Sequence, residues 1–371
     1  MKRVYRLDVY KLAEELSDMV WQDFDRWNKK VQNTVGYQII RSSETVQKHE
    51  DQISNFYFLI SPFRERLRAA LVIGSLVFLI IIPAVPKADA LNVFDFEEGR
   101  TVYGTLRTVK AGHTQTLLDI AKDHDLGYNQ IVAANPGMDP WVPSEGAGVL
   151  VPTVFVLPRG RLSSGVVVNL AEMRLYYFKS AEKGPSRFWT CPVGVGREGY
   201  STELSIYTVF SKAKDPIWVV PPSVLEEDPE LPPQVPPGPD NPLGKYILRF
   251  SRLSYGIHGT NRPWGVGRRV SHGCIRLYSE DIAFLFPLVP VGTLVRIIYE
   301  PIKVGWAEDK CWLQVYQDYE NKIDDPLATA FSGISACEQA IGPLKVDLKE
   351  IKRAIREQTG IPVPVARADK E

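Results

Sequence analysis

The stretch GIHGTNRPWGVGRRVSHGCIRL, residues 256–277, gathers two of the five histidines and one of the four cysteines of this 371-residue chain. Around it, from residue 165 onward, run period-2 segments such as GVVVNL, MRLYYF and LVRIIYE, which are typical of strands. The proline and glycines inside it favour a compact turn, which in an antiparallel sheet brings two strand ends side by side. The sequence therefore predicts a mainly β domain in which His258, His272 and Cys274 meet.

The residue types in this stretch suit acyl transfer through a cysteine. Sulfur attacks a carbonyl as the thiolate, and a free thiol forms little thiolate at neutral pH unless a base or a cation lies beside it. His258 and His272 are candidates for that base. Gly259 and Gly273 leave room for a substrate backbone, and the peptide N–H groups around Gly273 and Cys274 predict an oxyanion hole.

Zinc is the alternative use of these side chains. Structural zinc sites take four ligands, and the chain has no CxxC pair and no second Cys/His cluster. Alternation along a strand leaves His272 and Cys274 as the natural pair on one face. We therefore expect a thiol nucleophile, with no metal and no cofactor.

The pattern IHGT…SHGCIR resembles the signature of the L,D-transpeptidase family, which has a YkuD-type catalytic domain. The resemblance covers residues 165–306, because three further segments match: SKAKDPIWVVPPSV at 211, DNPLG at 240 and VPVGTLVRII at 289. It implies an α+β chain whose catalytic domain is mainly β and sandwich-like.

The same resemblance implies a role for each residue of the motif. Cys274 is the nucleophile, His258 is the base that takes its proton, and the Gly259 carbonyl orients the imidazole of that base. His272 and Gly273 shape the oxyanion hole together with the cysteine.

Two more residues of the motif receive roles. Ser271 holds the loop by hydrogen bonds, and Arg276 anchors an acidic group of a peptide stem. The planar guanidinium suits a carboxylate, and its place two residues after Cys274 puts it on the same face of a strand. A structural salt bridge from Arg276 to Glu280 or Asp281 is the alternative.

Two neighbouring segments bear on this site. The family's usual TPxGxF/Y turn reads STELSIY at 201–207, with Glu203 and Ser205 in place of proline and glycine. We expect an altered turn with activity retained, because this loop lies away from the motif in sequence. The proline-rich segment 219–244 cannot pair in a central strand, and it is predicted to form a surface flap, with a linker as the alternative.

Residues 101–157 predict a small unit in the order strand, helix, helix, strand. The segments TVKAGHTQTLLDIAK, ANP and VPT resemble a LysM module, which implies binding of N-acetylglucosamine-containing glycan in a groove between its loops. The sequence departs from that family at His113 and by two extra residues before Leu117. A domain that packs on the enzyme without binding sugar is the alternative.

The apolar run AALVIGSLVFLIII, residues 69–82, has a basic flank before it and Ala88-Asp89-Ala90 after it. Residues 66–90 therefore predict a signal peptide cleaved before Leu91, or a signal anchor if they are retained. The helical segment 1–65 weakly resembles small bacterial four-helix-bundle proteins, and we interpret it as a gene-model artefact or a fusion.

Positive and negative side chains are balanced in this chain. Lysine plus arginine and aspartate plus glutamate each number 44, so the net charge is zero and no global basic field predicts nucleic acid as a partner. Residues 307–371 are predicted as a C-terminal extension, with a strand in CWLQVYQ and an amphipathic helix in LKVDLKEIKRAIREQTG. A Cys311–Cys337 bridge is left open.

Taken with the resemblance, these features imply an exported periplasmic enzyme that acts on peptidoglycan stem peptides. It would pass an acyl group from Cys274 to an amine, giving a 3-3 cross-link or anchoring an envelope lipoprotein. With water as acceptor it would be an L,D-carboxypeptidase. A non-catalytic peptidoglycan-binding protein is the competing class. The chain is expected to contact a membrane only through residues 69–82, and only if these are not cleaved off.

Overall fold

The computed structural model describes residues 92–180, 186–200, 202–227, 229–251 and 255–369. Contacts divide the chain into two units, Met1–Val85 and Pro86–Glu371, and all described residues belong to the second. The predicted segments 1–65 and 66–90 lie outside the described residues. Within the described part of the chain, no helix is long and apolar enough to cross a membrane.

Residues 101–157 adopt the predicted order of elements. The unit consists of β2 (Val102–Lys110), α5 (Leu117–Asp123), α6 (Tyr128–Ala134) and β3 (Gly148–Val156), and its two strands pair in antiparallel fashion along their whole length. The helix α5 begins at a capping box, because Thr116 and Asp119 each bond the other's backbone N–H, at 3.1 and 2.8 Å. The resemblance of this unit to LysM stays a prediction.

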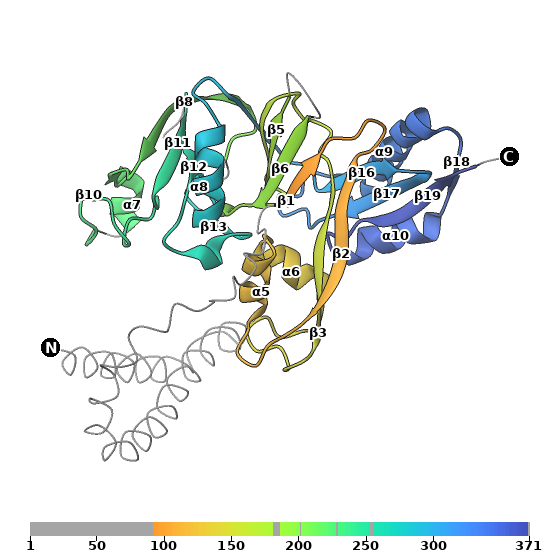
Figure 1. The fold of residues 1–371 in the computed structure, drawn as a ribbon, viewed down its shortest axis with the longest axis horizontal. Helices are drawn as coiled ribbons and strands as arrows, with labels where there is room; N and C mark the ends of the chain where they lie inside the picture. Colours follow the sequence, from red (N-terminus) through yellow and green to blue (C-terminus); the bar gives the residue numbers. More distant parts are fainter. Residues whose placement is uncertain (1–91, 181–185, 201, 228, 252–254, 370–371) are drawn as a thin grey trace, which may run out of the picture. The chain divides into compact units, whose positions relative to one another are not determined.

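The predicted β domain is built on one nine-stranded sheet (Figure 1). Its order is β1 (Asn92–Asp95), β6 (Arg187–Pro192), β5 (Arg174–Lys179), β4 (Gly165–Asn169), β15 (Leu294–Ile298), β8 (Ile206–Lys214), β11 (Tyr246–Phe250), β12 (Gly256–His258) and β14 (Ile275–Arg276). The mainly β content expected for residues 165–306 is confirmed. The first strand comes from outside that range and borders the sheet.

Apolar side chains cover both faces of this sheet, so β4 is buried along its whole length. On one face Val166 and Val168 join a cluster with Ile282 and Leu285 of α8 (Ser279–Leu288). On the other face Val167 packs with an aromatic cluster of Tyr103, Tyr176, Phe178 and Phe188. Burial on both faces explains why this strand reads as a continuous run of valines.

The C-terminal segment is a folded domain rather than an extension. Its sheet has the order β16 (Ile302–Ala307), β17 (Lys310–Val315), β19 (Val363–Ala368) and β18 (Leu344–Val346), with α9 (Pro326–Ile341) and α10 (Leu348–Glu357) packed against it (Figure 1). The strand in CWLQVYQ and the amphipathic helix are confirmed. Its first strand begins at Ile302, ahead of the predicted start at 307. Cys311 and Cys337 are buried free thiols.

Candidate active site

Residues 256–277 form two neighbouring strands at one edge of the large sheet. β12 and β14 pair in parallel, with His258 opposite Arg276. The expected antiparallel pairing is therefore wrong. A parallel pair needs a long crossover, which here runs through the 3-10 helix η4 (Pro263–Gly265) and the short strand β13 (Arg269–Ser271).

These strands border a cavity of about 360 Å³, a volume that accepts a small ligand or a peptide segment. It brings together five of the seven predicted site residues, namely His258, Ser271, His272, Cys274 and Arg276. The rest of its wall comes from Tyr200, Trp218, Pro221, Pro222, Ser223, Val224, Pro242, Leu243 and Tyr255.

His258 is held by the backbone of the next residue. Its Nδ1 lies 2.6 Å from the Gly259 carbonyl oxygen, which can only accept, so Nδ1 carries the proton and Nε2 is left as the acceptor. Burial and then the nearby charge of Arg276 lower the pKa of His258 to about 4. The imidazole is therefore neutral at neutral pH, and its unprotonated nitrogen can take a proton.

Cys274 is partly exposed at the cavity. Burial raises the pKa of its thiol, while a hydrogen bond with the Gly256 backbone and the charge of Arg276 act in the opposite direction. The resting site thus pairs a neutral thiol with a neutral imidazole, and forming the thiolate requires a proton transfer.

Ser271 and Gly273 fix the loop that presents the cysteine. The Ser271 hydroxyl donates to the Cys274 carbonyl oxygen at 2.6 Å and accepts from the Gly273 N–H at 3.1 Å. Gly273 has φ +103°, and a Cβ there would lie 2.7 Å from the ring of Tyr255, so only glycine suits this position. Because the Gly273 N–H is engaged by the serine, the Cys274 N–H is the better candidate donor to an oxyanion.

The side chain of Arg276 lines the cavity and is not paired with either of the carboxylates that follow it in sequence. Glu280 instead pairs with Lys122 at 3.4 Å, and Asp281 lies against Asp125. In the described part of the chain no ion pair joins Arg276 to an acidic residue, and its buried Nε has no hydrogen-bond partner. The salt bridge to Glu280 or Asp281, which was the alternative role for Arg276, is therefore not formed.

Comparison with known proteins identifies the family of this chain. The model of the L,D-transpeptidase catalytic domain, YkuD, matches residues 163–297. The chain is 36% identical over 277 residues to the probable L,D-transpeptidase ErfK/SrfK of Escherichia coli K12. The alignment covers 71% of this chain and 86% of that protein. The chain belongs to the L,D-transpeptidase family.

Two other relatives named as probable L,D-transpeptidases come from the same strain of Escherichia coli. YbiS is 36% identical over 69% of this chain and 85% of its own length. YcfS is 35% identical over 67% of this chain and 79% of its own length. These alignments extend well beyond the matched catalytic domain.

In this L,D-transpeptidase, His272 has partners that the sequence did not reveal. Arg197 Nη2 lies 2.9 Å from His272 Nε2, and since a guanidinium only donates, that nitrogen accepts. The ring of Tyr200 meets the imidazole edge-on at 4.8 Å, and the Arg197 guanidinium lies 4.6 Å from the centre of the tyrosine ring. In the sequence, Arg197 and Tyr200 were marked only by their position in the segment GREGY, residues 196–200, directly before the altered turn.

The altered turn contacts the L,D-transpeptidase motif directly. The Thr202 hydroxyl donates to the Gly273 carbonyl oxygen at 2.7 Å, so separation in sequence was a poor guide to distance. The turn is closed by Tyr207, whose hydroxyl donates to the Glu203 carbonyl oxygen at 3.0 Å. The substitutions therefore leave a turn that supports the cysteine loop.

The proline-rich segment 219–244 lies at the mouth of the L,D-transpeptidase cavity. It carries α7 (Pro222–Glu227) and the strand β10 (Gln234–Val235), which pairs with β9 (Trp218–Val219). The buried Asn241 ties the ends of this segment together, because its side-chain N–H groups donate to the carbonyl oxygens of Pro216 and Val235 at 2.8 and 3.2 Å. Residues from both of its ends line the cavity, as a flap would.

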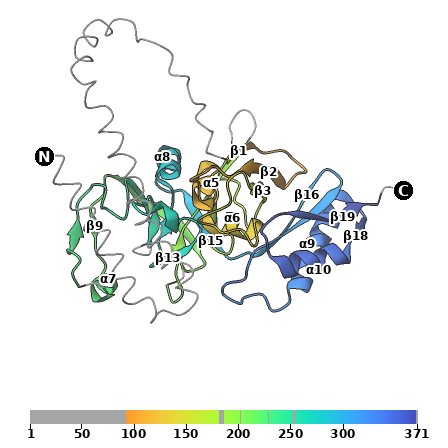
Figure 2. The ribbon, with the colours of Figure 1, turned by 90° about the horizontal axis from the view of Figure 1, so that it is seen from below.

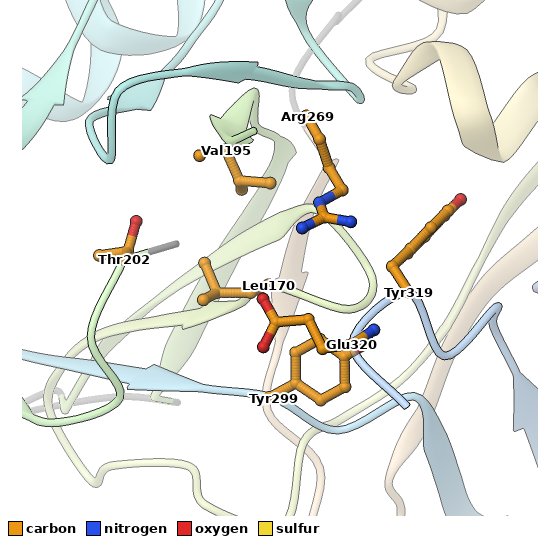
Figure 3. Close-up of a pocket in the computed structure, with 8 residues that line it drawn as sticks. Leu170, Val195, Thr202, Arg269, Tyr299, Tyr319 and Glu320 are labelled. Carbon is orange, nitrogen blue, oxygen red and sulfur yellow. Dashed lines mark hydrogen bonds between the residues drawn. The ribbon is translucent and has the colours of Figure 1, made fainter. Parts of the chain in front are cut away.

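A smaller cavity of this L,D-transpeptidase, which Cys274 does not line, is drawn in Figure 3. It measures about 10 Å³, which is room for one water at most. Arg269 extends over it toward the ring of Tyr319, 5.9 Å away, and Glu320 lies below (Figure 3). We assign it to packing between the catalytic and C-terminal domains.

Proposed function

We propose that the chain is a periplasmic peptidoglycan L,D-transpeptidase that works through a cysteine acyl-enzyme. The observation that carries the proposal is the held imidazole of His258, which lines one cavity with Cys274 and the unpaired guanidinium of Arg276. Family membership supports the same reaction.

In the first half-reaction the Cys274 thiol loses its proton to His258 Nε2, and the sulfur attacks the carbonyl of the L-residue of a tetrapeptide stem. The Cys274 N–H stabilises the oxyanion. The imidazolium then gives its proton to the departing amine, and D-alanine leaves. The Gly259 carbonyl keeps the imidazole in place throughout, through the bond to Nδ1.

Arg276 links substrate binding to the strength of the base. Its charge is the second cause of the lowered pKa of His258, after burial. A stem carboxylate bound to the guanidinium would offset that charge and raise the pKa of His258, so the base would strengthen when substrate is present. The resting neutral pair would then be activated by the substrate itself.

In the second half-reaction an amine attacks the thioester, and His258 takes the amine's proton. The acceptor is the side-chain amine of another stem, giving a 3-3 cross-link, or the lysine of an envelope lipoprotein. In this proposal residues 165–306 perform the chemistry, residues 101–157 form a LysM-like domain, and residues 66–90 direct export.

The test is to incubate purified sacculi with the enzyme and to identify the muropeptides by mass spectrometry. We expect new cross-linked or lipoprotein-linked tripeptide stems, and a Cys274→Ala variant that produces none. Release of free tripeptide stems alone would assign an L,D-carboxypeptidase. Absence of any change, together with no acyl adduct on Cys274 after carbapenem treatment, would leave only a binding protein.

A further inference from the structure

A second groove lies where the LysM-like unit meets the catalytic domain. It measures about 210 Å³ and is lined by Thr116, Leu118, Asp119, Lys122, Tyr128, Trp141, Pro263, Trp264, Val266 and Tyr278. The first six residues belong to the unit at 101–157, and the last four belong to the catalytic domain. Figure 2 shows α5, which carries part of one wall, beside α8, whose Glu280 pairs with Lys122.

Aromatic rings dominate this groove. Trp264 lies in η4 and is 59% exposed, an unusual state for so large an apolar side chain. Tyr128 and Trp141 pack 6.1 Å apart on the opposite wall. The guanidinium of Arg268 lies 3.5 Å from the centre of the Tyr128 ring and stacks on it. The groove thus offers flat apolar surfaces whose positions are fixed.

Trp141, which lines the groove, and Arg268, which stacks on the Tyr128 ring of its wall, both have polar atoms without a partner among the residues that the structure describes. The Nε1 of Trp141 and the Nε and Nη2 of Arg268 are buried without a hydrogen-bond partner in the described part of the chain. A buried donor without an acceptor is costly, so a ligand that brings oxygen atoms would be favoured. Asp119 and Lys122 carry opposite charges on the rim, which favours a neutral ligand.

The two walls are joined independently of any ligand. The N–H groups of Tyr128 and Asn129 donate to the carbonyl oxygens of Val266 and Gly267, both at 3.2 Å. Gly127 and Gly267 touch so closely that a Cβ on Gly267 would lie 2.3 Å from the Tyr128 nitrogen. The groove is therefore pre-formed, and a ligand would bind without a large ordering cost.

Glycan is the ligand that the LysM resemblance already implies for residues 101–157. We propose that the catalytic domain completes this site, and that Trp264 is its contact with the glycan strand of peptidoglycan. Sugar rings present C–H faces that stack on aromatic rings and hydroxyl or acetamido oxygens that accept hydrogen bonds, which is the combination found here. The site is composite, since one wall lies outside the LysM-like unit.

This inference rests on the proposed function, because the stem peptide of that substrate is covalently attached to the glycan. The η4 turn with Trp264 lies on the crossover between His258 and Ser271. Glycan held on this turn would therefore deliver its stem to the neighbouring cavity that contains Cys274. Binding at one site raises the effective concentration at the other.

The test measures binding of a neutral N-acetylglucosamine tetramer by calorimetry, using full-length Cys274→Ala protein so that no turnover interferes. Trp264→Ala should weaken binding by about fivefold to tenfold, the size expected for one lost aromatic contact. Trp264→Tyr keeps a ring and should retain most of the affinity. Phe331→Ala, which removes another exposed aromatic ring, from α9, is the matched control and should bind as the parent does.

Equal affinity in the Trp264→Ala and parent proteins would overturn the proposal. So would a groove that binds a free stem peptide, but not the sugar tetramer, in a Trp264-dependent way, because that marks a peptide-docking surface. In the active enzyme, Trp264→Ala should raise KM more for glycan-linked stems than for free stems. Trp264-dependent sugar binding supports the groove even if the Cys274 enzyme shows no transpeptidation, so the two proposals fail separately.

Discussion

Two buried polar clusters in the molecule differ in how completely their hydrogen bonds are satisfied. Lys303 donates to Glu172 at 2.7 Å, to the Val156 carbonyl oxygen at 2.6 Å and to the Tyr176 hydroxyl at 3.1 Å. Tyr176 and Tyr316 both donate to the other oxygen of Glu172, at 2.7 and 3.1 Å. This cluster is closed, and it ties the C-terminal domain to the catalytic sheet.

The cluster at the cavity is also built from buried groups, but it is left incomplete. His258 uses one ring nitrogen on the backbone and keeps the other as an acceptor, and Arg276 keeps a buried N–H without a partner. Removing charged groups from water is costly in both places, and only the closed cluster compensates for it within the protein. Of the two, the unsatisfied cluster is therefore the one prepared for a ligand.

The largest expected effect is at the incomplete cluster. His258→Ala should lower the rate at which a carbapenem acylates Cys274 by about 10²–10⁴, because the general base is lost. Intact-protein mass spectrometry over time measures this rate, and an unchanged melting curve shows that the fold is kept. An unchanged acylation rate would transfer the role of base to His272.

At the closed cluster the expected effect is on folding. Lys303→Met should lower the free energy of unfolding by about 3–5 kcal/mol, because Glu172 is left buried and unpaired. Urea unfolding measures the change. The double variant Lys303→Met/Glu172→Gln should recover much of the loss. A single variant as stable as the parent would mean that the cluster does not hold the domains together.

Arg276→Lys tests whether the unpaired guanidinium is kept for substrate. Turnover of tetrapeptide should fall by about tenfold, because the planar fork of donors is lost while the charge remains. Alkylation of Cys274 by iodoacetamide should be spared. Arg269→Lys, at the small cavity of Figure 3, is the matched control. If turnover, alkylation and thermal stability fall together, Arg276 supports the loop instead.

The smallest expected effect is on the pH dependence of stability, and it arises at a third buried cluster, a pair of carboxyl groups. Asp125 and Asp281 face each other, and one oxygen of each has no donor. Burial raises the pKa of Asp125 from 3.8 to about 7. The folded state therefore holds this proton more tightly than the unfolded state, and stability falls as pH rises from about 4 to about 7.

Replacing this carboxyl should reduce the pH dependence, while the contribution of the buried Asp281, whose pKa burial also raises, remains. Asp125→Asn should melt at a higher temperature than the parent at pH 8, and the difference should shrink at pH 4, where both carboxyls are protonated in the parent. Thermal melts at the two pH values measure it. A parent whose stability rises between pH 4 and 7 relative to the variant would contradict the assignment.

The sequence predicted the parts of the site that depend on local chemistry. The HGT and SHGC segments indicated the residue types. Gly273 was expected to leave room for a substrate backbone, and in the structure its lack of a side chain also avoids a clash with the ring of Tyr255. The parallel pairing of the two strands was missed, because a turn-rich crossover of this length is compatible with either direction. The family resemblance supplied the roles that spacing alone left open between His258 and His272.

Contacts between distant segments could not be predicted. Arg197 and Thr202 reach the motif across more than seventy residues of sequence, at separations of 75 and 71. Glu172 and Lys303 are 131 residues apart, and no pattern in either segment announces the partner. The C-terminal sheet was missed for a similar reason, since three of its strands share one apolar cluster with α9 and α10, which are distant in sequence.

The order of strands in the large sheet means that the catalytic residues precede, along the chain, the strand that joins the two halves of the sheet. β15 lies between β4 and β8, yet it follows the cysteine loop in the chain. A polypeptide emerging from its N-terminal end therefore presents the reactive thiol while the two halves of the sheet still have open edges, and open edges invite pairing with other chains. A chain interrupted before Leu294 would contain every catalytic residue and still lack the strand that makes them an enzyme.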